Sequence, residues 1–407
     1  MNIQTKSYRE RGWGILAVAL VKRDNGQTLG TLRKAIETCG GFEGLKPGTK
    51  VIIKPNMVMR SFVRDQPPLG MVTPAETVEC MVTLLREHGC NDITIADGGV
   101  IHPDLKLNTV TAYQAAGYNE LSERLNVPLV DLNEGPFVTV EMEGLPVKIA
   151  RLIAEAEFLI DIPVLKTHNQ TKVSLGIKNL KGVIAYESKK DCHRHDLMRS
   201  IALLGRAIKV DLTIVDGTYG LQKGPTSDDY HKMDLFVAGK DILEVDIVGS
   251  WLLGYDPAEV EHLSIYAELA GRSLSLANVE VIGEEINDLA KPLKWYATWA
   301  RDLIALYKIK GITVEPPDPT CCSGCGFGIA TALIRFFTAN PGKDFNNIAI
   351  VMGRQKMTDP DMRKVIALGK CACETNSSHP NIVKVPGCPA GLKIMTERLQ
   401  AVADEIV

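Results

Sequence analysis

The sequence contains no apolar run of the roughly 18 residues that a membrane-spanning helix needs. The longest such run near its start, residues 15–21, has only the length of a strand. The basic residues of the N-terminal part are not followed by a signal-peptide core or a small-residue cleavage site. These absences predict a cytoplasmic protein without a membrane span.

An excess of charge of one sign is also missing, because the net charge is −3. Nucleic-acid binding depends on a dense basic face that neutralises phosphates, so nucleic acid is excluded as a main partner. The dinucleotide-binding fingerprint is absent as well, since Asp97-Gly98-Gly99 lacks the third glycine and the helix spacing. We therefore predict no bound nucleotide.

Cysteine, in contrast, is plentiful. The chain has ten cysteines, and six of them lie in its last quarter, namely Cys321, Cys322, Cys325, Cys371, Cys373 and Cys388. In a large cytoplasmic chain, such a set indicates metal or redox chemistry rather than a disulfide framework. The run Cys192-His193-Arg194-His195 is expected to be an exposed loop, because neighbours in sequence point in different directions.

Buried strands alternate with helices along the chain, which predicts an α/β fold with a doubly wound, mostly parallel sheet. A smaller α/β domain follows it. We divide the chain into a lead-in over residues 1–45, an α/β domain over 46–275, a helical connector over 276–312 and a cluster domain over 313–407. Helices are expected near residues 31–39 and 196–210.

Polar side chains follow the predicted strands, at the edge where open α/β sheets bind ligands. Strand ends and the segment after them supply Lys54, Asn56, Asp97, Lys166, Thr167, His168, Thr171, Lys178, Asn179 and Asp216. The ammonium groups suit a small anionic ligand, a carboxylate or phosphate, held by charge-assisted hydrogen bonds. We assign Lys166, His168 and Asp97 as catalytic candidates and the others as substrate-binding. The plainer interpretation is that polar residues gather at strand ends in every α/β fold.

Four C-terminal cysteines are predicted to bind one [4Fe–4S] cluster, which takes four thiolates. Cys322 and Cys325 can reach it from a single tight loop, while Cys371 and Cys388 follow later strands. Three loops would then meet at one edge of a sheet. Paired cysteines at this spacing also serve zinc, and buried thiols without metal are a further interpretation.

Three motifs resemble, in the same order, those of the small subunit of nickel–iron hydrogenases and its quinone-oxidoreductase relative. They are Cys322-Ser323-Gly324-Cys325, Ala367-Leu368-Gly369-Lys370-Cys371-Ala372 and Pro386-Gly387-Cys388-Pro389. The resemblance covers about residues 313–405 and implies a flavodoxin-like domain with a [4Fe–4S] cluster on Cys322, Cys325, Cys371 and Cys388.

This segment also departs from the family pattern. Ala390 replaces a usual second proline, and the doublet Cys321-Cys322 resembles the quinone-oxidoreductase version, in which adjacent cysteines can both bind. Cys321 could therefore displace Cys325 or Cys371, and Cys373 is another spare thiol.

The earlier part of the chain resembles a second family, the domain of unknown function 362, over about residues 48–260. The resemblance lies in Lys54-Pro55-Asn56, Asp97-Gly98-Gly99, Lys166-Thr167-His168 and Lys178-Asn179-Leu180. Members often carry iron–sulfur modules, but the family implies no particular activity.

The leading hypothesis is an iron–sulfur redox protein, in the strict case an oxidoreductase. Electrons would pass through the C-terminal cluster to or from the anion at the strand ends, with a ferredoxin or flavoprotein as electron partner. One alternative is a maturation factor that holds a cluster or metal for delivery, which the spare thiols favour. The other is a non-redox enzyme with a structural or sensing cluster.

Overall fold

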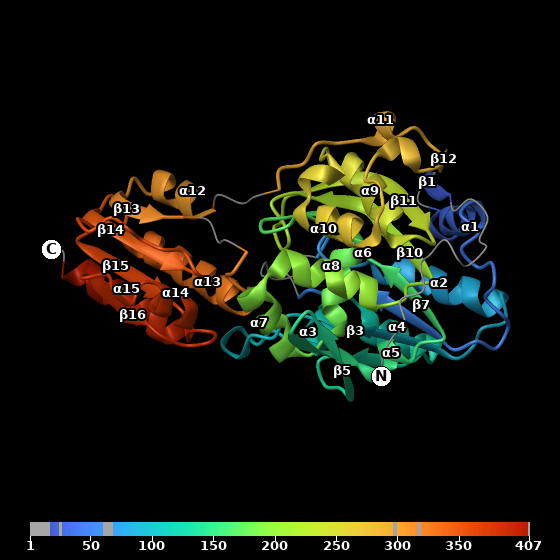
Figure 1. The fold of residues 1–407 in the computed structure, drawn as a ribbon, viewed down its shortest axis with the longest axis horizontal. Helices are drawn as coiled ribbons and strands as arrows, with labels where there is room; N and C mark the ends of the chain where they lie inside the picture. Colours follow the sequence, from blue (N-terminus) through green and yellow to red (C-terminus); the bar gives the residue numbers. More distant parts are fainter. Residues whose placement is uncertain (1–16, 24–26, 60–67, 296–298, 316–318, 406–407) are drawn as a thin grey trace.

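The computed structural model describes residues 17–23, 27–59, 68–295, 299–315 and 319–405. Figure 1 shows a large unit, coloured blue to yellow, and a smaller C-terminal unit, coloured orange to red. The predicted fold class, a mostly parallel α/β sheet followed by a smaller α/β unit, is confirmed. Within the described ranges, every helix is too short or too polar to cross a membrane.

The large unit, called the front unit below, is built on a ten-stranded sheet. In sheet order its strands are β12 (Val281–Gly283), β1 (Val18–Lys22), β11 (Tyr230–Gly239), β10 (Leu212–Leu221), β7 (Phe158–Ile162), β2 (Val51–Pro55), β3 (Ile93–Asp97) and β4 (Leu129–Asp131); β8 (Val164–His168) pairs with β10, and β9 (Lys172–Ser174) with β8. The central strands β7, β2, β3 and β4 are parallel, and β11 is antiparallel to both its neighbours. All five residues of each of β2, β3 and β7 are buried, as expected for parallel strands covered on both faces.

Helices cover both faces of this sheet, each over its own apolar core. One face carries α1 (Thr28–Thr38), α2 (Ala75–Glu87), α3 (Thr109–Ala115) and α4 (Tyr118–Leu125). The other carries α6 (Gly176–Asn179), α8 (Leu197–Ala207), α9 (Ile242–Leu252) and α10 (Glu261–Ala270). Outside this sheet, β5 (Phe137–Met142) and β6 (Leu145–Ala150) form an antiparallel hairpin, followed by α5 (Arg151–Ala154).

The front unit reaches beyond its predicted limits of 46 and 275. Strand β1, in the predicted lead-in, pairs with β11, and β12, in the predicted connector, pairs with β1. These pairings join residues more than 200 positions apart, so no local pattern reveals them. The rest of the connector forms α11 (Ile286–Leu289) and α12 (Trp299–Leu306).

The helix predicted over 196–210 is present as α8, but a further helix that was not predicted directly precedes it. Helix α7 (Tyr186–His195) ends where α8 begins, because the Asp196 side chain accepts a hydrogen bond from the backbone N–H of Arg199 and caps α8. This capping geometry needs an extended backbone at Asp196. The predicted exposed loop at 192–195 is therefore the last turn of a helix, with Cys192 and His193 buried.

The C-terminal unit has a four-stranded parallel sheet of β13 (Lys310–Val314), β14 (Asp344–Met352), β15 (Lys364–Leu368) and β16 (Ile382–Val385). Helices α13 (Ser323–Ala339) and α15 (Leu392–Asp404) pack on one face and α14 (Lys370–Thr375) on the other. Among the described residues the strands lie in chain order, whereas flavodoxin has the order 2-1-3-4-5. Because the strands are parallel, the loops that carry the cysteines all leave from their carboxyl ends.

Candidate functional site

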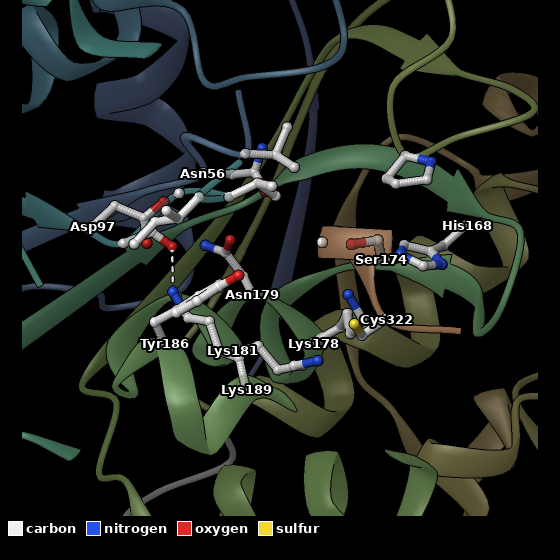
Figure 2. A pocket seen from close by; sticks show the side chains of 18 of the residues that line it. Asn56, Asp97, His168, Ser174, Lys178, Asn179, Lys181, Tyr186, Lys189 and Cys322 are labelled. Carbon is white, nitrogen blue, oxygen red and sulfur yellow. Dashed lines mark hydrogen bonds between the residues drawn. The ribbon is translucent and has the colours of Figure 1, made fainter. Parts of the chain in front are cut away.

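The carboxyl ends of β2, β3 and β8 open onto a cavity of about 120 Å³, the lysine pocket. Six of the predicted catalytic and substrate-binding residues line it: Asn56, Asp97, Lys166, His168, Lys178 and Asn179. Figure 2 shows Asp97 and Asn56 on one side of the pocket, lysines of the segment from α6 to α7 on another, and His168 with Ser174 at its far end. Residues more than 120 positions apart in sequence are thereby brought to one cavity.

A buried ion pair holds one wall of the pocket. The Lys54 ammonium, which is completely buried, lies 2.9 Å from a carboxylate oxygen of Asp97 and donates to the Pro55 carbonyl. Asp97 also accepts a hydrogen bond of 2.7 Å from the Met57 backbone N–H. On the other side, Asn179 donates to Asp161, whose pKa is raised by burial to about 7. Lys54 is therefore a structural part of the site rather than a residue that faces the cavity.

Lys166 faces the pocket from β8, and its described partners include no carboxylate. Its ammonium donates to the Asn56 side-chain oxygen at 3.1 Å and to the Met71 carbonyl at 2.9 Å. Both acceptors are neutral, and burial lowers the pKa of Lys166 to about 7. This lysine is thus oriented by its neighbours while its charge is left without compensation.

His168 is held in one neutral tautomer. Its Nδ1 accepts a hydrogen bond of 3.1 Å from the Gln170 backbone N–H, so the ring proton is on Nε2. Burial, followed by the charge of Lys178, lowers the pKa of His168 well below its usual value. At neutral pH the residue can donate one hydrogen bond to a ligand, but it is not a cation.

Three predicted substrate-binding residues are turned away from the pocket. Thr167 alternates with Lys166 and His168 along β8, and its hydroxyl bonds to the Leu221 carbonyl. The Thr171 hydroxyl donates to the Val173 carbonyl. Asp216 accepts hydrogen bonds from the Thr77 hydroxyl and the Thr218 backbone N–H. Their polar groups stabilise the backbone and the packing of helices rather than a ligand.

The pocket also contains residues that the sequence analysis did not select. Most of the titratable ones come from residues 181–193, namely Lys181, Tyr186, Lys189, Lys190 and His193. The sequence feature that could have identified them is the density of lysines in this stretch. It was not used, because lysines in an exposed loop are normally solvated and do not indicate a binding site. Helical geometry turns these side chains to one side, toward the strand ends.

A second cavity, the thiol cavity, lies beside the first. Its lining includes all four predicted cluster ligands, Cys322, Cys325, Cys371 and Cys388, together with Cys321. Backbone hydrogen bonds tie the loops together, from Gly369 N–H to the Val385 carbonyl and from Lys370 N–H to the Gly387 carbonyl. The structure therefore brings the three cysteine loops to one place.

Gly369 has a packing role in this cavity. Its φ is +93°, and a Cβ at this position would lie 3.3 Å from the Cys325 sulfur. Only glycine adopts this backbone conformation without strain and leaves space for the neighbouring thiol. Cys373, the spare cysteine of the same loop, instead donates its thiol to the Ala367 carbonyl and does not line the cavity.

Charged groups of the front unit reach the thiols. Arg194 donates from Nη2 to the Cys388 sulfur at 3.0 Å. A hydrogen bond from the Cys325 thiol lowers the pKa of Cys322 to about 6, which favours its thiolate. Among the described residues, no three His, Cys, Asp or Glu side chains converge as ligands of a single metal ion.

The two cavities share a wall. Cys322 lines both of them, and Gly324 brings its loop against the Tyr186 hydroxyl. His193 joins the two units, because its Nδ1 donates to the Pro319 carbonyl and its Nε2 accepts from the Lys181 ammonium, both at 2.8 Å. Gln170 adds a hydrogen bond of 2.6 Å to the Cys321 carbonyl.

Known proteins resemble this chain at low identity. A "thylakoid-associated protein" of Synechocystis sp. is 26% identical over 254 residues, which cover 60% of this chain and 75% of the relative. The lactate racemase apoprotein of Thermoanaerobacterium thermosaccharolyticum is 13% identical, with a TM-score of 0.38 over 96% of this chain and 90% of that chain. At this TM-score the structural likeness supports no argument about function.

A family model gives the more specific match, over residues 51–251, and its description is "Domain of unknown function (DUF362)". The four strand-end stretches that resembled this family all lie inside the matched range. The front unit therefore matches the DUF362 family model over residues 51–251, in agreement with the resemblance of its strand-end motifs.

Proposed function

We propose that this protein is an iron–sulfur redox protein that exchanges electrons with a small anion bound beside the cluster. The observation that carries the proposal is the position of Cys322, which lines the lysine pocket and the thiol cavity at once. The resemblance of the three cysteine motifs to a cluster-binding family supports it from the sequence.

The residues of the thiol cavity fit a [4Fe–4S] cluster better than a single metal ion. In such a cluster each thiolate binds a different iron, so the ligands stand around a volume instead of converging on one point. The four cysteines line one cavity without converging, which agrees with this arrangement. When bound, the cluster would supply one-electron transfer.

The chain's own residues would then divide the work. The lysines of the pocket hold the anion, the Lys54–Asp97 ion pair fixes the pocket wall, and His168 donates a hydrogen bond from Nε2. The Arg194 guanidinium offsets negative charge on the thiolates. A ferredoxin or flavoprotein would serve as the electron partner, in the cytoplasm.

The test is iron and acid-labile sulfide analysis of the anaerobically purified chain, with an EPR spectrum after dithionite reduction. We expect about four irons and four sulfides per chain and a reducible signal. Cys388→Ser should lose the signal, whereas the matched variant Cys373→Ser should keep it, because that thiol points away from the cavity. Zinc in place of iron, or no metal, would refute the proposal.

A maturation factor is a second candidate, and one observation favours it. Cys321 lines the same cavity as the four proposed ligands, so a fifth thiol is positioned to exchange with them. A delivery protein should lose its cluster to a chelator or an apoprotein within minutes, whereas an electron-transfer protein should retain it. Cys321→Ser would slow the loss in the first case and leave retention unchanged in the second.

A further inference from the structure

The lysine pocket contains more positive charge than the chain itself compensates. Five lysines line it, Lys166, Lys178, Lys181, Lys189 and Lys190. Of these, Lys190 forms an ion pair with Glu187 at 2.7 Å. Asp97 is the one carboxylate lining the cavity within the described ranges, and it is already paired with the Lys54 ammonium.

Among the residues that the structure describes, the other four lysines have only neutral hydrogen-bond partners or none. Lys166 contacts an amide and a carbonyl oxygen, and Lys189 donates to the Gly98 carbonyl and the Asn133 side-chain oxygen. Lys181 donates to the neutral ring of His193. In the described part of the chain, Lys178 has no hydrogen-bond or ion-pair partner. Burial lowers the pKa of each of these four lysines, to about 7 in Lys166 and about 8 in Lys189.

The other walls of the pocket define the rest of the ligand. Val58, Val100, Ile101 and Pro225 give the cavity an apolar side. The buried Tyr186 hydroxyl, which also lines the cavity, has no hydrogen-bond partner among the described residues. Buried polar groups are nearly always paired, so this hydroxyl is available to a ligand oxygen.

We propose that the lysine pocket binds a small organic oxyanion with at least two negative charges, a dicarboxylate or a phosphate ester. Burial favours the neutral form of these lysines, and bound negative charge favours the ammonium form, so a dianion stabilises more of them as ammonium groups than a monoanion does. An inorganic ion would fill the charged side and leave the apolar side empty. The inference deepens the proposed function, since it names the anion class, but it does not depend on the cluster.

The experiment is a calorimetric titration of the full chain with four probes: malonate, methyl phosphate, inorganic phosphate and propanoate. We expect malonate or methyl phosphate to bind at least tenfold more tightly than propanoate, which has malonate's carbon number but one charge. The stronger of the two decides between a dicarboxylate and a phosphate ester. Binding of propanoate as tight as either dianion, or binding of none of the probes, would overturn the inference.

Matched variants locate the site. Lys178→Gln should weaken binding of the dianions at least tenfold and leave the affinity for propanoate nearly unchanged. Lys172→Gln is the control, because Lys172 is paired with Glu259 on the surface outside the pocket. Equal dianion affinities of Lys178→Gln and Lys172→Gln would show that the dianion does not bind in the lysine pocket. Iron analysis of the same samples keeps the two proposals separate, because a cluster without dianion preference overturns only this inference.

Discussion

Lys54 illustrates how individual side chains of this site divide into those that face the ligand and those that hold the walls. It was predicted to bind substrate because it stands at the end of a buried strand. The structure places its ammonium against Asp97, completely buried. A buried charge must be paired or neutralised. The Lys54–Asp97 ion pair therefore has a structural role in the pocket wall. Sequence position alone identifies the edge of the sheet but not which strand-end charges pair with each other.

The alternation of side chains along a strand would have resolved part of this ambiguity. Lys166 and His168 are two positions apart on β8 and both line the pocket, while Thr167 points to the opposite face. Strand alternation could not have predicted the role of Asp216, because its hydrogen-bond partner Thr77 comes from α2, far away in sequence.

His262 offers a test of how one buried titratable residue affects stability. It lies on α10, fully buried, and neither ring nitrogen has a partner among the described residues. Burial lowers its pKa from 6.5 to about 3. Below pH 6.5, His262 is therefore protonated in the unfolded chain but stays neutral in the folded chain until about pH 3. Because the unfolded state binds the extra proton, this residue makes folding less favourable as the pH falls.

For His262→Leu we expect the fall in unfolding free energy between pH 7.5 and pH 5 to be about 2 kcal/mol smaller than in the wild type. Urea denaturation of both proteins at the two pH values measures it. His195→Leu is the control, because that ring is exposed and meets water in both states. An equal fall in His262→Leu and the wild type would show that the ring is protonated in the folded state.

At the scale of elements, local signals located the strands well and the helix boundaries less well. Buried apolar runs that end in proline or glycine identified β2 and β3. The run over 158–165 was predicted to be one strand, whereas the structure divides it at Pro163 into β7 and β8. The start of α8 at Asp196 was predicted correctly, but α7 was missed, because its last turn over 192–195 was predicted to be an exposed loop. Since α7 supplies Tyr186, Lys189 and Lys190, this error hid a wall of the pocket.

Gly182, in the 3₁₀ turn Leu180–Val183, shows how closely that wall approaches the strand ends. A Cβ there would lie 2.0 Å from the Asp97 carboxylate oxygen and 3.0 Å from the Lys54 ammonium. Gly182→Ala must push the turn and the buried ion pair apart. We expect a loss of about 1–3 kcal/mol in unfolding free energy, together with weaker malonate binding.

Urea denaturation and the malonate titration measure both effects. Gly30→Ala in α1 is the matched control, since the nearest atom to its added Cβ is a Gln27 side-chain oxygen at 3.7 Å. Removal of a helical glycine there should leave the protein unchanged or stabilise it by about 0.5–1 kcal/mol. Similar behaviour of the two variants would mean that the turn at Gly182 can move freely.

At the scale of the whole molecule, the arrangement of the two units could not be predicted. The sequence indicates an anion site and a cysteine site, but no local pattern states the distance between them. In the structure, contacts from α7 and Gln170 to the C-terminal unit bring the sites together at Cys322. Figure 1 shows α7 beside α13 at this junction.

Arg194 makes this junction testable, because it belongs to the front unit and its guanidinium bonds to Cys388 of the other. A cation hydrogen-bonded to a ligand sulfur stabilises the more negative, reduced form of an iron–sulfur cluster. Arg194→Gln should therefore lower the reduction potential, by about 30–60 mV, which is roughly three- to tenfold in a one-electron equilibrium. An EPR-monitored redox titration at matched iron content measures the shift.

Arg199→Gln provides the control, since Arg199 pairs with Glu143 on the surface of the front unit and reaches no cysteine. The same titration in the presence of malonate extends the test to the pocket. Negative charge bound beside Cys322 should lower the potential of the wild type, and by linkage reduction should weaken malonate binding by the same factor. Equal potentials in Arg194→Gln and the wild type would mean that the front unit does not influence the cysteines electrostatically, and the two sites would then act independently.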